Sequence, residues 1–251
     1  MTPLGCDEAT ELTTVPAPVP AGRPAAAAES SRLRDDLVPF FRLIEARQTG
    51  PARVRLRKRL DRDQTDGQAC FLFALSYHRE RRYGLARPYF ERALAHEPSF
   101  APAWYFSGWA SYYLGDIEAA RVAFERHLLL TPDAGDSHFG LGLIALDEDR
   151  LDDAADRFET ALEIHGDTPG RDKDRSKAHA RLADVFVRRG HFEDAKAELE
   201  TATTLFPDHY EAYYKLYRVH MRLEETEAAD AALAKFHAAR ERVRPGTRFP
   251  E

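Results

Sequence analysis

Alanine and large apolar residues recur at a regular spacing from residue 67 onward. The alanines at positions 86, 120, 154, 195 and 229 are evenly spaced, except that the interval between Ala154 and Ala195 is longer. Four positions after each alanine stands a large apolar residue: Phe90, Phe124, Phe158, Leu199 or Leu233. Twelve positions before each alanine stands Ala74, Gly108, Gly142, Ala183 or Tyr217. Residues four apart share one face of an α-helix, so the pattern predicts pairs of amphipathic helices that pack closely at their small residues.

Proline and glycine mark the ends of these predicted helices. Pro98, Pro132 and Pro207 each follow an alanine of the series by twelve positions and are expected to end the second helix of a unit. Gly115 and Gly190 are expected in the turns within units, where a positive φ costs glycine little. The predicted units are 67–100, 101–134, 135–168, 176–209 and 210–240. A single unit cannot bury its apolar face alone, whereas stacked units can.

The second unit carries Trp104, Gly108, Gly115, Ala120, Phe124 and Pro132 in order. This order resembles the tetratricopeptide repeat, a helix–turn–helix unit whose period the predicted units share. The resemblance covers about 67–240. It implies an all-α protein folded as a right-handed superhelical solenoid of stacked helix–turn–helix repeats.

The remaining segments are less regular. Residues 1–30 are rich in proline and alanine and are expected to be disordered. Residues 31–66 are expected to be helical, and 33–66 are one period long with Phe40, Ala52 and Leu56 in plausible positions, so a degenerate sixth unit remains open. The segment 166–174 is expected to be a loop between units, and 241–251 a C-terminal tail.

Charge and hydropathy bear on partners and compartment. Lys and Arg number 36 and Asp and Glu 42, giving a formal net charge of −6, so no nucleic acid partner is expected. The basic run from Arg53 to Arg62 is interpreted as a solvated helix face. No apolar stretch is long enough to span a membrane. Two locations remain open: the cytoplasm, or the bacterial cell envelope if the true start lies upstream and Cys6 is a lipidation site.

No catalytic motif is found in the sequence. The patterns of serine hydrolases, zinc proteases, phosphate-binding loops and dinucleotide-binding folds are missing, and ten histidines are scattered without ligand spacing. The chain is therefore predicted not to be an enzyme, with no catalytic residues, no metal site and no cofactor.

The resemblance also implies where a partner would bind. The concave surface of tetratricopeptide proteins is lined by positions 2, 5, 9, 12 and 13 of the first helix of each unit. The candidate groove residues are Phe71, Leu75, Tyr105, Trp109, Tyr112, Tyr113, Phe139, Leu143, Arg188, Tyr214, Arg218 and Arg222. The expected ligand is an apolar peptide or amphipathic helix whose anionic end faces the arginines. Alternatively, residues 35–47 fold back and fill the groove.

The predicted function is therefore a scaffold or adaptor that binds a protein or peptide in an aromatic-lined concave groove. The alternative is a non-catalytic accessory subunit that recruits substrate to a partner enzyme. The sequence specifies neither the identity of the partner nor the oligomeric state.

Overall fold

The computed structural model describes residues 32–246, and within this range the chain is helical with no strand. The candidate lipidation residue Cys6 and the segments 1–31 and 247–251 lie outside the described residues. A short 3-10 helix, η1 (Asp35–Leu37), precedes twelve α-helices. They are α2 (Val38–Glu45), α3 (Thr49–Leu60), α4 (Gly67–His78), α5 (Tyr83–His96), α6 (Ala101–Tyr113), α7 (Ile117–Leu130), α8 (Gly135–Asp147), α9 (Leu151–His165), α10 (Asp172–Arg189), α11 (Phe192–Leu205), α12 (Tyr210–Arg222) and α13 (Thr226–Val243).

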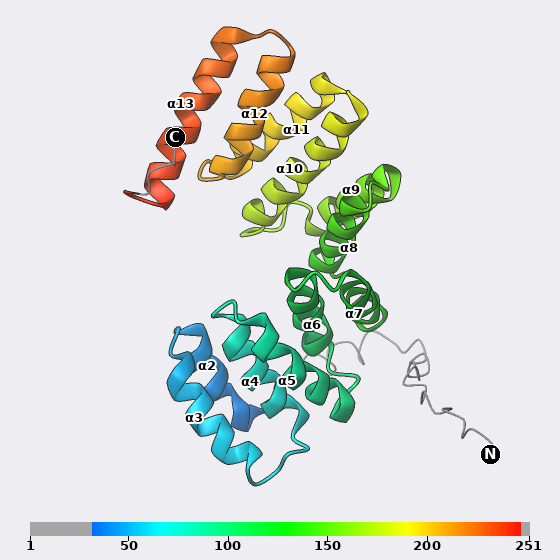
Figure 1. Ribbon diagram of the computed structural model, residues 1–251, viewed down its shortest axis with the longest axis vertical. Helices are drawn as coiled ribbons and strands as arrows, with labels where there is room; N and C mark the ends of the chain where they lie inside the picture. The colour runs from blue at the N-terminus through cyan, green and yellow to red at the C-terminus, as the bar shows by residue number, and fades with distance from the viewer. Residues whose placement is uncertain (1–31, 247–251) are drawn as a thin grey trace, which may run out of the picture.

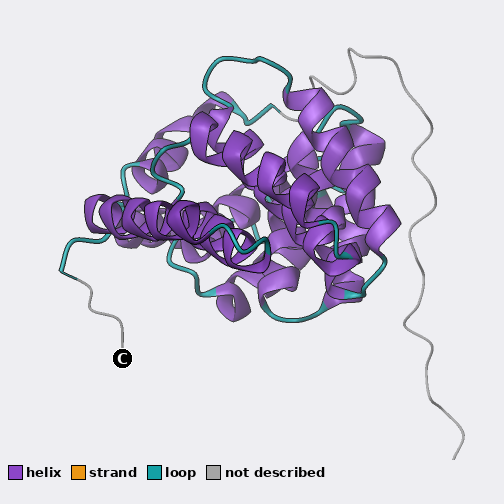
Figure 2. Cartoon of the chain, turned by 90° about the horizontal axis from the view of Figure 1, so that it is seen from above, coloured by secondary structure: helices purple, strands orange, loops and turns teal. Residues whose placement is uncertain are grey.

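The helices pack in sequence order, which confirms the predicted all-α solenoid of helical repeats. Each of α4, α6, α8, α10 and α12 (the A helices) packs chiefly against the helix that follows it, the B helix of its pair. Each B helix also packs against the next A helix. Figure 1 shows the pairs following one another along an arc, with α2 and α3 at one end and α13 at the other. Figure 2, seen from above, draws the described residues as helices and connecting loops.

Every turn within a helix pair contains one residue in the left-handed region. These residues are Arg47, Arg81, Gly115, Asp149, Gly190 and Glu224, with φ between 58° and 79°. The amide of the next residue returns to a carbonyl in the last turn of the A helix, as in His191 N to Phe186 O at 2.9 Å. This is the hydrogen bonding of a Schellman-type helix end. The turn between α2 and α3 has the same geometry, with Arg47 one repeat period before Arg81, which supports the proposal that 33–66 form a sixth unit.

The bounds of two predicted units differ from the structure. Helix α10 begins at Asp172, so the last residues of the expected 166–174 loop are helical. Asp172 and Asp174 lie in the first turn of α10, where carboxylates interact favourably with the helix dipole. The last helix, α13, continues beyond residue 240 to Val243. Helices α5, α7 and α11 each end two residues before Pro98, Pro132 or Pro207.

Phenylalanine rings fill the space between units, and glycines on the neighbouring helices make room for them. Phe124 of α7 is fully buried. A Cβ atom on Gly108 would lie 2.8 Å from its ring, and one on Gly140 would lie 2.7 Å from it. A Cβ atom on Gly142 would lie 2.6 Å from the ring of Phe158 in the same way. The close approach of helices along the solenoid therefore requires glycine at these positions.

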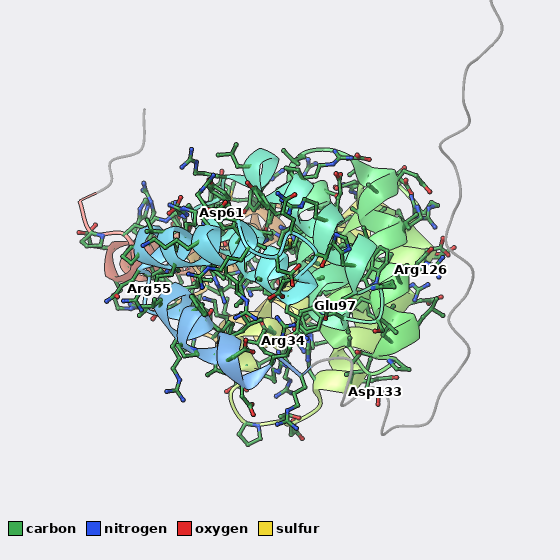
Figure 3. All side chains as sticks on the ribbon, turned by 90° about the horizontal axis from the view of Figure 1, so that it is seen from below. Arg34, Arg55, Asp61, Glu97, Arg126 and Asp133 are labelled. Atoms are coloured by element: carbon green, nitrogen blue, oxygen red, sulfur yellow. The ribbon has the colours of Figure 1, made fainter. Side chains whose placement is uncertain are left out.

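Ion pairs hold the N-terminal end, and they involve part of the basic run that the sequence suggested was a solvated face. The carboxylate of Asp66 caps α4 by accepting from the amide of Ala69 at 3.0 Å. It also pairs with Arg34 at 2.5 Å and Arg59 at 2.6 Å. Two arginines of the run are thus engaged, because Arg53 also pairs with Glu80 at 2.8 Å. Figure 3 looks onto this end of the molecule, where the labelled Arg55 lies on α3 and is exposed.

We expect Gly142→Ala to destabilise the protein by roughly 1–3 kcal/mol, because the added methyl group overlaps the buried ring of Phe158. The free energy of unfolding from urea titration provides the measurement. Gly84→Ala is the matched control, since a Cβ there meets no atom within 4 Å and alanine favours the helix by up to about 1 kcal/mol. Equal stability of the two variants would contradict the role given to the glycines.

Candidate protein-binding groove

The A helices form a groove with a volume of about 870 Å³. Residues from α4 to α13 line it, so it spans all five C-terminal helix pairs. One wall, from α5, α6 and α8, is aromatic, and the opposite wall, from α10, α12 and the end of α13, carries most of the cations.

Stacked rings form the aromatic wall. The ring of Tyr113 stacks on Tyr83 at 4.7 Å between centroids and on Trp109 at 5.8 Å. Trp109 packs edge-on against the buried Phe124 at 5.2 Å, so its indole ring also belongs to the core. Tyr113 is 55% exposed. It is therefore the aromatic side chain on this wall that is best placed to contact a partner without any repacking.

Tyr112 is held by a hydrogen bond across the A helices. Its hydroxyl donates to Oδ2 of Asp147 on α8 at 2.8 Å. Burial raises the pKa of Tyr112, and the bond to Asp147 raises it further, so the hydroxyl remains protonated and stays a donor. Burial likewise raises the pKa of the neighbouring Tyr105. The two phenols therefore present neutral, oriented rings to the groove.

Lysines and arginines on the opposite wall are partly neutralised. The ammonium of Lys215 on α12 bonds to Asp184 Oδ2 at 2.7 Å and to the carbonyl of Ala180 at 3.1 Å. Burial lowers the pKa of Lys215, and Asp184 opposes this effect. Asp184 also accepts from Arg181 at 3.1 Å. Lys177 pairs with Asp174 at 3.0 Å.

Two histidines in the groove lining are held neutral. Burial lowers the pKa of His78 and of His209 to about 4 in each case. His209 Nδ1 lies 2.7 Å from the hydroxyl of Ser176. Among the described residues, Nε2 of His78 has no hydrogen-bond partner. These rings therefore contribute to packing around the groove and not to its positive charge.

The structure brings half of the predicted site residues together in this groove and separates the others. The six groove residues are Tyr105, Trp109, Tyr112, Tyr113, Phe139 and Leu143. Arg188 lines an adjoining pocket of about 350 Å³ and binds the carbonyl of Leu146 and Asp149. Arg218 and Arg222 line a further pocket of about 220 Å³ between α10, α11 and α12. Tyr214 lies on the same face of α12 and is 43% exposed.

Phe71 and Leu75 were wrongly assigned to the groove surface. Phe71 is 3% exposed because Phe100 and Phe106 pack on it at 5.1 and 5.9 Å. Leu75 is fully buried in the core that it shares with Leu37 and Ile44. The N-terminal helix pair and the second unit cover both side chains, so neither is available to a partner.

The alternative in which residues 35–47 fill the groove is also wrong. Of the described residues that line the groove, none precedes His78. Helix α2 instead packs against α3 and α4 at the end of the solenoid. Arg79 at the edge of the groove pairs with Glu45 of α2 at 2.5 Å, and this ion pair links α2 to the lining.

Sequence reasoning placed Lys177 on the concave surface but missed three other cations of this wall. Lys173, Arg181 and Arg244 line the groove, and none of them occupies an expected position of an A helix. The signal was the longer interval between Ala154 and Ala195, because the added residues extend α10 at its N-terminus.

Comparison with known proteins agrees with this architecture. Models described as tetratricopeptide repeat match residues 71–128, 108–169 and 145–216, which together span more than half of the chain. The chain belongs to the tetratricopeptide-repeat family. No curated protein shows a significant sequence match.

Several solved tetratricopeptide-type structures superpose on the chain. PilF from Pseudomonas aeruginosa does so with a TM-score of 0.66 at 19% identity, over 89% of this chain and 94% of PilF. The C-terminal part of a tetratricopeptide-repeat protein from Cytophaga hutchinsonii gives 0.63 at 12% identity, over 82% and 80%. YrrB, described as a TPR protein with an unusual peptide-binding site, gives 0.55 at 19% identity, over 76% and 93%. At these identities the similarity shows the fold alone.

Two further findings concern metals and membranes. Across residues 32–246, no three His, Cys, Asp or Glu side chains gather in a way that could hold a metal ion. Within the same range, no helix is both long and apolar enough to cross a membrane. Basic and acidic side chains of the groove instead pair with one another, as Lys215 does with Asp184 and Lys177 with Asp174.

The groove histidines predict a loss of stability in mild acid. The pKa of His78 is about 4 in the folded chain and about 6.5 when unfolded, so the unfolded chain binds more protons between these values. The stability that depends on neutral His78 is therefore present above pH 6.5 and is lost as the pH falls towards 4. We expect His78→Leu to reduce the loss in unfolding free energy between pH 7 and 5 by roughly 1–2 kcal/mol.

Urea titration at both pH values measures this difference. Leucine is a suitable replacement because Leu146 stands at the same position two units later. The exposed His237 provides the control substitution, His237→Leu. An unchanged pH dependence in His78→Leu would show that His78 does not carry this effect.

Proposed function

We propose that the chain is a protein–protein interaction scaffold that binds a peptide or helical segment of a partner in the groove described above. The observation that carries this proposal is the exposed ring of Tyr113, supported from behind by Tyr83 and Trp109 on the lining of an 870 Å³ groove. An aromatic ring fixed in place loses little conformational entropy on binding, and such rings are common anchors of interfaces.

Membership of the tetratricopeptide-repeat family supports the same proposal, since such proteins act in general as scaffolds for protein partners. The peptide-binding site in the description of YrrB belongs to that protein, and it offers a precedent on a similar fold. The partner's identity would decide between an adaptor and an accessory subunit that brings substrate to an enzyme.

The proposal predicts that Tyr113→Glu abolishes partner capture from a lysate of the source organism, or weakens it at least tenfold. A carboxylate at this position removes the ring and places a charge on the aromatic wall. Tyr113 is more than half exposed, so the helical content measured by circular dichroism should remain that of the wild type. Quantitative mass spectrometry of captured proteins provides the measurement.

Leu129→Glu is the matched control, because Leu129 is 59% exposed and lies on the B helix α7, away from the groove lining. Capture of the same proteins by both variants would rule out the groove as the binding site. If Leu129→Glu still captures the partner and Tyr113→Glu does not, the result supports the groove as the binding site.

A further inference from the structure

Leu199 occupies the position that phenylalanine holds in the three preceding units. Phe90, Phe124 and Phe158 are fully buried between their helix pairs, and Leu199 is buried in the same way. A leucine side chain is smaller than a phenylalanine ring. Leu199 is one of the residues that line a pocket of about 220 Å³, which we call the Leu199 pocket. One molecule of liquid water occupies roughly 30 Å³. The Leu199 pocket is several times larger, so it has room for a side chain of several carbon atoms.

The walls of the Leu199 pocket are mainly apolar. They are formed by Ala183 and Val187 of α10, Phe192 and Leu199 of α11, and Val219 of α12. Val187 is 38% exposed, so the apolar lining continues to the molecular surface. An apolar wall that reaches the surface favours occupation by an apolar group from outside.

Two arginines stand at this pocket without a partner. Arg218 and Arg222 line it and are exposed, and among the described residues neither has an ion pair or a hydrogen bond. The one carboxylate of the pocket lining, Asp184, already pairs with Lys215 at 2.7 Å and with Arg181 at 3.1 Å. The positive charge of the two guanidinium groups is therefore not balanced locally.

The exposed face of α12 also combines apolar and cationic side chains. Arg218 follows Tyr214 by four positions, and Met221 and Arg222 follow Arg218 by three and four, so each of them neighbours Arg218 on the helix surface. Tyr214 and Met221 are 43% and 51% exposed. Guanidinium groups bind carboxylates, as they do phosphates, through paired hydrogen bonds, and a carboxylate is the anion that an unmodified peptide carries.

We propose that the Leu199 pocket binds one large aliphatic or aromatic side chain of a partner peptide, and that Arg218 and Arg222 pair with a carboxylate next to it. This inference rests on the proposed peptide-binding function and names the chemistry of the ligand. The carboxylate comes either from an Asp or Glu side chain or from the peptide's C-terminus. Occupation of the pocket buries its apolar wall, and the carboxylate offsets part of the positive charge of the two arginines.

Selection of a phage-displayed library of random peptides on the full chain tests the proposal. We expect the selected peptides to share a large apolar residue with Asp or Glu within two positions. In synthetic peptides, replacing the apolar residue by alanine or the acidic residue by its amide should each weaken the Kd at least tenfold. Basic peptides, or peptides without an apolar residue, would overturn the proposal.

Variants of the chain locate the site. Leu199→Phe places the ring found in the three preceding units against the pocket, narrows it and should weaken the Kd at least tenfold. The double variant Arg218→Ala/Arg222→Ala changes only exposed side chains, so it tests the site even if Leu199→Phe does not fold. It should also weaken the Kd at least tenfold, whereas the control double variant Arg55→Ala/Arg62→Ala should not.

The outcomes separate this proposal from the more general one. If the selected peptides bind both pocket variants as tightly as the wild type but bind Tyr113→Glu weakly, the Leu199 pocket is wrong and the groove stands. If the peptides are insensitive to Tyr113→Glu and to the pocket variants alike, both proposals fail. Comparing each peptide as a C-terminal acid and as an amide identifies the source of the carboxylate.

Discussion

The structure depends on one repeated contact, a buried phenylalanine ring placed against glycine backbone of the adjoining helices. Phe124 shows it most fully, because glycines on two different helices, Gly108 and Gly140, lie against the same ring. The ring supplies apolar area, and the missing Cβ atoms let the helix axes come close enough to use it. The contact recurs one period later between Phe158 and Gly142, so it holds the helix pairs in the middle of the arc close together.

The part of this fold that could be predicted from sequence is the part set by such local contacts. The spacing between Ala120 and Phe124, and its recurrence one period later, is sufficient to predict the helix pairs and their stacking. Which side chains are exposed on the inner surface depends on how neighbouring units pack over them. The spacing of residues in the sequence does not give this information. Phe71 occupies a groove position in its own helix and is nevertheless buried, because Phe100 and Phe106 of the next unit lie over it.

Leu199 is a second residue whose surroundings could not be predicted from the spacing. In the pattern, Leu199 counts as one more large apolar residue in the series that includes Phe158. Only the packed structure shows that Leu199 lines a pocket, and that Arg218 and Arg222 stand beside it. The extended α10 is a similar case. The longer interval between Ala154 and Ala195 was visible in the sequence, but only the structure shows that the added turn of α10 contributes charged side chains to the groove wall. The groove is consequently aromatic on one wall and cationic on the opposite wall.

The buried apolar side chains of the described residues form four clusters along the chain, and half-buried rings such as Phe186 and Trp109 connect neighbouring ones. The cluster built on Leu199 is distinct from the one built on Phe158, and it has the smaller side chain at its centre. Cooperativity between units is transmitted only through their mutual faces. Opening of α11 to α13 therefore does not require the N-terminal helices to melt, and amide hydrogens should become accessible in a gradient along the solenoid, with the half that carries the unpaired arginines exchanging first.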